Sequence, residues 1–216
     1  MKIPLFPLNT VLFPGLPIQL HIFEPRYKQM IRECVATESP FGVVLIRQGR
    51  EALGPVAQPY DIGCTAQIIS VERTPGDRFN ITAVGKERFE IIALDTVSQP
   101  YLMGTVEMLE MDEAYEPMLN RSRRHLSTWL RTYVDILSQA SDSDFDFSKL
   151  PNAPVRLAYL AASLLQNPNR EKQSLLATND PAELIDELIE HYRRETPLLR
   201  KMVGTEPKMQ GMFGIN

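Results

Sequence analysis

The sequence predicts an α+β protein, because the spacing of its apolar residues changes once along the 216 residues. Up to about residue 112, short apolar runs alternate with turn residues, a pattern typical of strands. Beyond that point, apolar residues recur three and four positions apart, which is typical of amphipathic helices. We therefore expect a β domain at residues 1–112, an α-helical bundle at 113–203 and a flexible tail at 204–216.

The β part contains candidate strands and a single good helix candidate. The strands are predicted at residues 16–23, 41–47, 63–73, 78–95 and 101–109, and the last three are separated by segments rich in turn residues. The helix is predicted within residues 24–39, where five residues share one face: Tyr27, Met30, Ile31, Cys34 and Val35. This part is therefore expected to be a β-rich domain with one packed helix.

The helical part contains two strong amphipathic segments and an apolar one between them. Residues 123–139 carry a stripe formed by Leu126, Trp129, Leu130, Tyr133, Val134 and Leu137. Residues 153–166 are apolar nearly all round, which predicts a helix buried on several sides, and a turn with a short helix follows. The last helix is predicted after Asp180 as N-cap, with Pro181 at the first helical position and Glu183 at the capping-box position. Its core face is predicted to consist of Leu184, Ile185, Leu188, Ile189 and Tyr192.

The motifs in the sequence favour a protein without catalytic, cofactor-binding or metal-binding residues. The sequence contains no phosphate-binding loop, no GxGxxG turn and no GxSxG motif, and the three histidines lack metal-ligand spacing. Two cysteines, Cys34 and Cys64, are predicted to be buried free thiols. We therefore predict that the protein is not an enzyme.

Charge and hydropathy narrow the choice of partners. The net charge is −4 and basic residues are scattered, which argues against a nucleic acid as the partner. The sequence has no run of about 18 apolar residues, and prolines interrupt its N-terminus, so neither a membrane span nor a signal peptide is predicted. We expect a cytoplasmic protein.

The stretch HIFEPRY, residues 21–27, gathers polar side chains in the manner of an active site. An architectural role explains it better, because Pro25 suits the first turn of a helix and Glu24 precedes that helix where a carboxylate is favoured. Arg26 and Tyr27 then enter the first turn. We interpret this stretch as a corner between a strand and a helix.

The same residues carry a family resemblance. The segment PLFPLNTVLFPGLPIQLHIFEPRYKQMI resembles the opening of the Lon N-terminal (substrate-binding) domain family, and similar stretches continue through both parts of residues 3–195. The resemblance implies a PUA-like β pseudobarrel followed by a helical bundle. It supplies no catalytic residues. The matched positions, here called the signature positions, are expected to be structural: Phe13, Pro14, Gly15, Phe23, Glu24, Pro25, Arg26, Tyr27, Gly63, Gly85, Arg88 and Phe89.

The resemblance also implies a function. In Lon proteases this region helps to recognise unfolded or tagged substrates for an ATPase and a Ser–Lys protease, and the sequence resembles a stand-alone version without either module. We therefore expect a binding module for unfolded or peptide-like protein segments, with an ATP-dependent protease as a further partner in trans. Contacts are predicted from an apolar groove between the two parts and from the loop 47–61, through Arg47, Leu53, Val56 and Tyr60. The alternatives are an RNA-binding PUA-like protein and a cryptic hydrolase.

Overall fold

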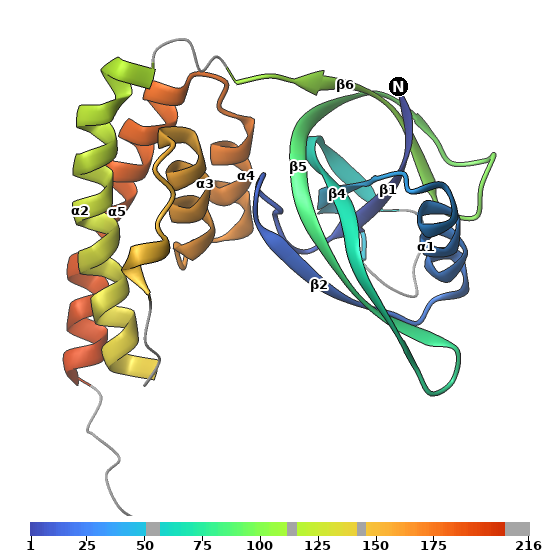
Figure 1. The fold of residues 1–216 in the computed structure, drawn as a ribbon, viewed down its shortest axis with the longest axis horizontal. Coiled ribbons are helices and arrows are strands. Elements are labelled where there is room, and N and C mark those ends of the chain that lie inside the picture. Colours follow the sequence, from blue (N-terminus) through green and yellow to red (C-terminus); the bar gives the residue numbers. More distant parts are fainter. Residues whose placement is uncertain (51–56, 112–115, 142–145, 206–216) are drawn as a thin grey trace, which may run out of the picture.

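The computed structural model describes residues 1–50, 57–111, 116–141 and 146–205. Within them the chain forms a β part and a helical part, which lie side by side in Figure 1. The predicted α+β class is confirmed. Strands end at Leu109 and helices resume at Glu116, so the change of structure falls where the spacing of apolar residues changes. The last helix extends to Thr205, two residues beyond the predicted end of the bundle, and residues 206–216 of the predicted tail lie outside the described residues.

The described strands form one sheet that closes on itself. They are β1 (Lys2–Leu8), β2 (Pro17–Ile22), β3 (Phe41–Gln48), β4 (Gln58–Thr74), β5 (Arg78–Asp95) and β6 (Leu102–Leu109). Their order is β2-β5-β4-β3-β1-β6, and β6 also pairs with the C-terminal half of β5. The sheet therefore closes through β5, and β2 extends it along the N-terminal half of that strand (Figure 1).

Strand β1 was not predicted, because Pro4 and Pro7 interrupt its apolar residues. The pairing of the strand explains why both prolines are tolerated. Residues Lys2–Leu5 pair with β6, whereas Leu5–Leu8 pair in parallel with β3, so each half of β1 has a neighbour on one side only. A proline whose nitrogen faces the open side removes no hydrogen bond from the sheet.

Helix α1 (Pro25–Thr37) packs against the sheet through four of the five residues of its predicted face. Tyr27, Met30, Ile31 and Cys34 are buried in one apolar cluster together with residues of the strands, and the Tyr27 ring stacks on Phe6 with 4.1 Å between centroids. The prediction that Val35 belongs to this packed face was wrong, because Val35 is 47% exposed. Val35 lies at the edge of the apolar stripe formed by the four buried residues.

The corner HIFEPRY joins β2 to α1 as predicted, with Pro25 as the first helical residue. Glu24 is the N-cap residue but makes no side-chain cap hydrogen bond; its carboxylate instead accepts a hydrogen bond of 3.0 Å from Nε of Arg26. The Arg26 guanidinium lies over the Tyr27 ring at 4.6 Å from its centroid. His21 and Phe23 share the exposed face of the strand, whereas Ile22 is buried. These contacts are those of a structural corner.

The helical part consists, within the described residues, of α2 (Glu116–Ser141), the 3-10 helix η1 (Phe147–Lys149), α3 (Pro154–Leu164), α4 (Asn169–Ala177) and α5 (Pro181–Thr205). The two long helices, α2 and α5, lie side by side, and α3 and α4 lie toward the sheet (Figure 1). Helix α5 is capped by Asp180, whose Oδ1 accepts a hydrogen bond of 2.8 Å from the Ala182 amide. Within the part of the chain that the structure describes, no helix is both long and apolar enough to cross a membrane.

One core holds the helices together, and a residue of the β part belongs to it. The predicted faces of α2 and α5 are buried there, including Leu126, Leu130, Leu184 and Leu188 at 0% exposure. Phe13, from the segment between β1 and β2, is buried in the same cluster. The helical and β parts are therefore joined by shared apolar packing.

Candidate functional site

Arg88 of β5 connects the sheet to the helices by hydrogen bonds. Arg88 is 2% exposed, and its Nη1 donates hydrogen bonds to the carbonyl oxygens of Leu176 at 2.9 Å and Thr178 at 2.7 Å. Both carbonyls lie at the C-terminal end of α4, where backbone oxygens lack partners within a helix. A guanidinium is also favoured there by the negative end of the helix dipole.

The segment Phe13–Gly15 makes a second connection. The Phe13 ring lies 5.9 Å from the Tyr159 ring of α3, between centroids. The Gly15 amide donates to the Gly85 carbonyl oxygen at 2.8 Å, and the Gly85 amide donates to the Leu16 carbonyl oxygen at 2.9 Å. A Cβ atom at Gly85 would overlap the carbonyl oxygen of Phe13, so this close approach of two backbones requires glycine.

Two further signature positions form a contact inside the sheet. A Cβ atom at Gly63 would lie 2.6 Å from Cζ of the buried Phe89 ring, so the absence of a side chain on β4 leaves room for the ring. Phe89 is part of a small apolar cluster on the inside of the closed sheet. Gly15, Gly63, Gly85, Arg88 and Phe89 thus make packing, turn and interface contacts.

A groove of about 990 Å³ runs between the two parts, beside these contacts. One wall comes from the segment just before β2, from β5, and from the end of β6 and the residues after it. The other wall comes from α3 and the residues before it. Half-buried apolar side chains from both parts line it: Leu16, Val84, Met108, Leu109, Met111 and Leu160. Val155 and Tyr159 are buried at the same wall. Such a concave apolar surface has the size and chemistry of a site for a short peptide segment.

Charged side chains also reach the groove. Lys86 and Arg156 are exposed cations, Arg88 is a buried one, and Glu87 and Glu110 are exposed carboxylates. Within the described residues, no carboxylate forms an ion pair with any of the three cations. The groove is therefore lined by apolar side chains and by charged ones, of which Arg88 is buried.

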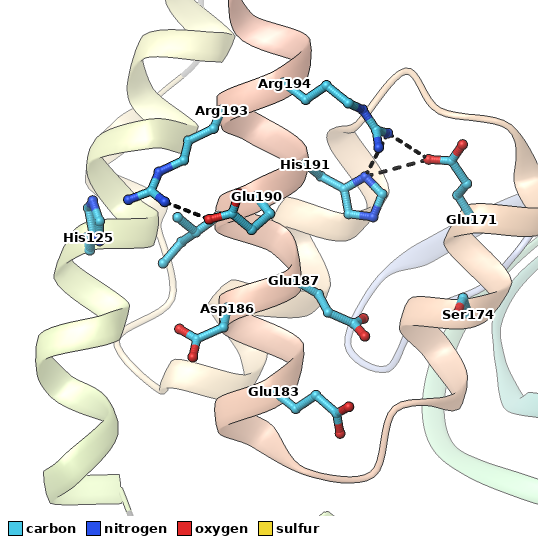
Figure 2. A pocket seen from close by; sticks show the side chains of 11 residues that line it. His125, Glu171, Ser174, Glu183, Asp186, Glu187, Glu190, His191, Arg193 and Arg194 are labelled. Carbon is cyan, nitrogen blue, oxygen red and sulfur yellow. Dashed lines mark hydrogen bonds and ion pairs between the residues drawn. The ribbon is translucent and has the colours of Figure 1, made fainter.

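A second hollow of about 990 Å³ lies between α2, α4 and α5 (Figure 2). Its side chains are mostly charged, and several of them bind one another. Arg194 donates to Glu171 at 3.0 Å, Arg193 donates to Glu190 at 2.5 Å, and Nδ1 of His191 lies 2.9 Å from the amide nitrogen of Asn167. Among the described residues that line it, Ile189 is the one apolar side chain. We therefore take the groove between the two parts as the candidate site.

The contact residues predicted from the loop 47–61 fall in different places. Arg47 lies in β3, in agreement with the strand predicted at residues 41–47, at the end of which the loop was predicted to begin. Tyr60 was placed in an irregular segment, which was wrong, because it belongs to β4. Arg47 is exposed, and Tyr60 is half-buried and lines a hollow of about 370 Å³ beside Arg170 and Gln173 of α4. Leu53 and Val56 lie outside the described residues. The peptide contacts of these four residues remain a prediction.

Side chains with reactive potential are held in structural roles. Cys34 and Cys64 are free and buried, and burial raises the pKa of Cys34 to about 11 and that of Cys64 to about 12. Across the described part of the chain, no group of three His, Cys, Asp or Glu side chains is arranged to hold a metal ion. His21 and His125 are exposed, each bonded to a neighbouring side chain, Asn80 and Trp129 respectively.

The closed sheet, the helical bundle behind it and the groove between them define an α+β protein of two joined parts. Its family follows from the sequence: the chain belongs to the family described as the ATP-dependent protease La (LON) substrate-binding domain, which matches residues 2–194. The resemblance noted from the signature positions is thereby confirmed.

Relatives of this family are similar to the chain along nearly all of its length. The chain is 30% identical over 212 residues to a Lon protease of Parabacteroides distasonis, covering 95% of the chain and 25% of that relative. It is 25% identical over 191 residues to a Lon protease of Syntrophus aciditrophicus, covering 86% of the chain and 24% of that relative. The chain therefore spans about a quarter of the length of these proteases.

Two solved structures share the fold. A Lon N-terminal domain protein from Xanthomonas campestris superimposes with a TM-score of 0.65 at 23% identity, covering 88% of this chain and 98% of that one. The N-terminal domain of a Mycobacterium avium complex Lon protease gives a TM-score of 0.66 at 18% identity, covering 89% and 98%. The arrangement of the β part and the helical part is thus a property of the family fold.

Proposed function

We propose that the protein is a binding module for unfolded or peptide-like protein segments, which it holds in the groove between its two parts. Membership of the Lon substrate-binding family supports a role in substrate recognition. The observation that carries the proposal is the groove itself, about 990 Å³ in volume and lined by half-buried apolar side chains from both parts. Segments that are buried in folded proteins and exposed in unfolded ones present apolar side chains, which such a groove would remove from water.

The binding role requires no catalytic residue in this chain. We propose that the protein acts as an adaptor or a chaperone-like binder, and that an ATP-dependent protease in trans consumes what it binds. The buried thiols and the mutually paired charges of the helical hollow support a non-enzymatic role, since neither provides an accessible nucleophile beside an oriented base.

Fluorescence anisotropy with a labelled, unfolded apolar peptide tests the groove. Met108→Gln combined with Leu160→Gln places amides on opposite walls and should weaken binding about tenfold, because apolar contact area is lost on both sides. Ile69→Gln is the matched control, since Ile69 is 62% exposed on β4 and does not line the groove. Circular dichroism would verify folding. Equal loss in the control and the groove variant would contradict the proposal.

The predicted contacts at Arg47 and Tyr60 form a second, separable part of the proposal. Both are near the ends of adjacent strands, and Tyr60 presents an aromatic ring beside α4. Cross-linking to unfolded casein with mass-spectrometric mapping tests them. Adducts confined to the groove, with none at residues 47–60, would remove these residues from the binding surface.

RNA binding is the weaker candidate. The net charge is −4, and the groove carries two exposed carboxylates beside its cations. A filter-binding titration decides the matter, because an RNA complex would weaken steeply as salt is raised, whereas an apolar peptide complex would not.

A further inference from the structure

One end of the groove has the chemistry of a carboxylate site. Helix α3 begins there, with Ala153 as N-cap and Pro154 as its first residue, and no side chain caps it. The first backbone bond of the helix is donated by the Leu157 amide to the Ala153 carbonyl oxygen. The amides of Val155 and Arg156, which precede it, therefore have no acceptor within the helix, and they lie at the positive end of its dipole.

Three cations line the same groove, and no ion pair joins any of them to another described residue. Arg156 belongs to the first turn of α3 and is exposed, and Lys86 projects from β5 on the other wall. Arg88 also lines the groove, although it is only 2% exposed. Its Nη1 binds two carbonyl oxygens, but its Nη2 is buried and has no hydrogen-bond partner within the described residues.

The charge of Arg88 matters because of where it lies. A buried guanidinium that is bonded to neutral carbonyls alone keeps its full positive charge in a region where water screens little. The two carboxylates at the groove, Glu87 and Glu110, are exposed to solvent, which screens them. Arg88, Arg156 and the amino end of α3 thus together favour an anion against an apolar wall.

We propose that the groove binds the C-terminal end of a polypeptide whose last residues are apolar, and that it recognises the terminal α-carboxylate. This inference rests on the proposed peptide-binding function and specifies its substrate. A C-terminal apolar residue brings a carboxylate and an apolar side chain to the site in a single residue. An internal Asp or Glu would also supply a carboxylate, but it would take the place of an apolar residue that could contact the walls.

The test compares three peptides that differ in whether they carry a carboxylate and in where they carry it. A short N-terminally labelled peptide ending in Leu-Val-Phe-Leu is titrated into the full chain by fluorescence anisotropy, first with a free carboxylate and then as the amide. A third peptide, an amide with Glu in place of the Val, carries the same charge on an internal side chain. The free acid should bind about tenfold more tightly than either amide. The plain amide lacks the charged acceptor, and the Glu peptide carries it at a position away from the chain terminus.

Variants assign the effect to the amino end of α3. Arg156→Gln should reduce the preference for the free acid over the amide several-fold, because it removes one of the cations beside the amino end of α3. Arg200→Gln is the matched control, because Arg200 is an exposed arginine of α5 that does not line the groove. Raising the salt concentration should diminish the same preference.

The outcomes separate this inference from the function on which it rests. Equal binding of the free acid and the amide overturns the carboxylate site and leaves peptide binding intact. Equal binding of the free acid and the internal Glu peptide, both tighter than the plain amide, overturns the choice of a chain terminus. Failure of all three peptides to bind overturns the proposed function itself.

Discussion

The guanidinium of Arg88 donates a hydrogen bond of 2.7 Å to the carbonyl oxygen of Thr178, and the two residues belong to different parts of the protein. Arg88 lies in the middle of β5, and Thr178 caps the C-terminal end of α4. The bond therefore fixes the helical part against the sheet at one wall of the groove. Since a buried arginine is costly without partners, the two carbonyl oxygens also offset the cost of burying its guanidinium.

Replacing Arg88 should destabilise the whole fold. Arg88→Met keeps much of the side-chain volume but leaves the carbonyl oxygens of Leu176 and Thr178 without their donor, so the free energy of unfolding should fall by about 2–4 kcal/mol. Urea unfolding followed by circular dichroism measures this. Lys86→Met is the control, because Lys86 is exposed two residues earlier and its loss should change stability by less than about 0.5 kcal/mol. An Arg88→Met protein as stable as the parent would contradict the role assigned to this bond.

Gly85 and Gly15 lie at the same junction, and we expect replacement by alanine to destabilise the protein more at Gly85 than at Gly15. Gly85→Ala places a Cβ atom against the backbone of Phe13, which cannot move independently of the core, so we expect destabilisation by about 3 kcal/mol or more. Gly15→Ala meets no atom within 4 Å, but its φ of +80° is strained for alanine and should cost about 1 kcal/mol.

Thermal unfolding of both variants provides the comparison, since each is the control for the other. A larger loss at Gly15 than at Gly85 would show that backbone conformation, rather than the contact between the two backbones, decides the requirement for glycine at this junction.

The sequence was sufficient for features that depend on local periodicity. The α+β class and the buried faces of α2 and α5 follow from spacings of two or of three and four residues, and burial agrees with them. Strand β1 was missed because the signal for a strand weakens at proline, and whether a proline is tolerated depends on which neighbours the strand has. That is a property of the sheet, not of the segment.

The groove depends on contacts that no local pattern contains. Its walls come from segments near residues 16, 84–88, 108–111 and 151–160, which only the closure of the sheet and the docking of α3 bring together. Nothing in the motif around Arg88 distinguishes a buried arginine from an exposed one. The sequence could predict that a groove between the two parts would exist, but not which side chains line it.

The tip of the β4–β5 hairpin is held to α1 by an ion pair that should respond to pH. Asp77 accepts hydrogen bonds from Lys28 at 3.0 Å and from Arg32 at 2.8 Å, and these partners hold the pKa of its carboxyl below the usual range. Because the folded pKa is lowered, the stabilisation is present above the unfolded pKa of about 3.9 and is lost as the pH falls through the folded value.

The variant Asp77→Asn tests this, since asparagine also tolerates the positive φ of 55° found there. It should be slightly less stable than the parent at neutral pH, and the difference should shrink as the pH falls below about 4. Urea titrations at several pH values measure it. Glu72→Gln, an exposed carboxylate on the same hairpin, is the control and should show no such convergence. A difference that does not change with pH would exclude the ion pair as its cause.

The two thiols should be unreactive in the folded protein, because both are shielded from solvent and both ionise only at high pH. Cys34 is 3% exposed and Cys64 is 0% exposed, and burial raises their pKa values to about 11 and about 12. Since the thiolate is the reactive form, reaction with a disulfide reagent at neutral pH should be slow, and it should become fast for both thiols in urea, where the pKa returns to about 8.5. Absorbance of the released thiolate follows the reaction. Cys34→Ser and Cys64→Ser assign the phases, because each leaves a single thiol. One rapid phase without urea would show that a thiol is accessible in the folded protein. If that phase persisted in Cys64→Ser, the accessible thiol would be Cys34, and the packing of α1 against the sheet would be the part that opens.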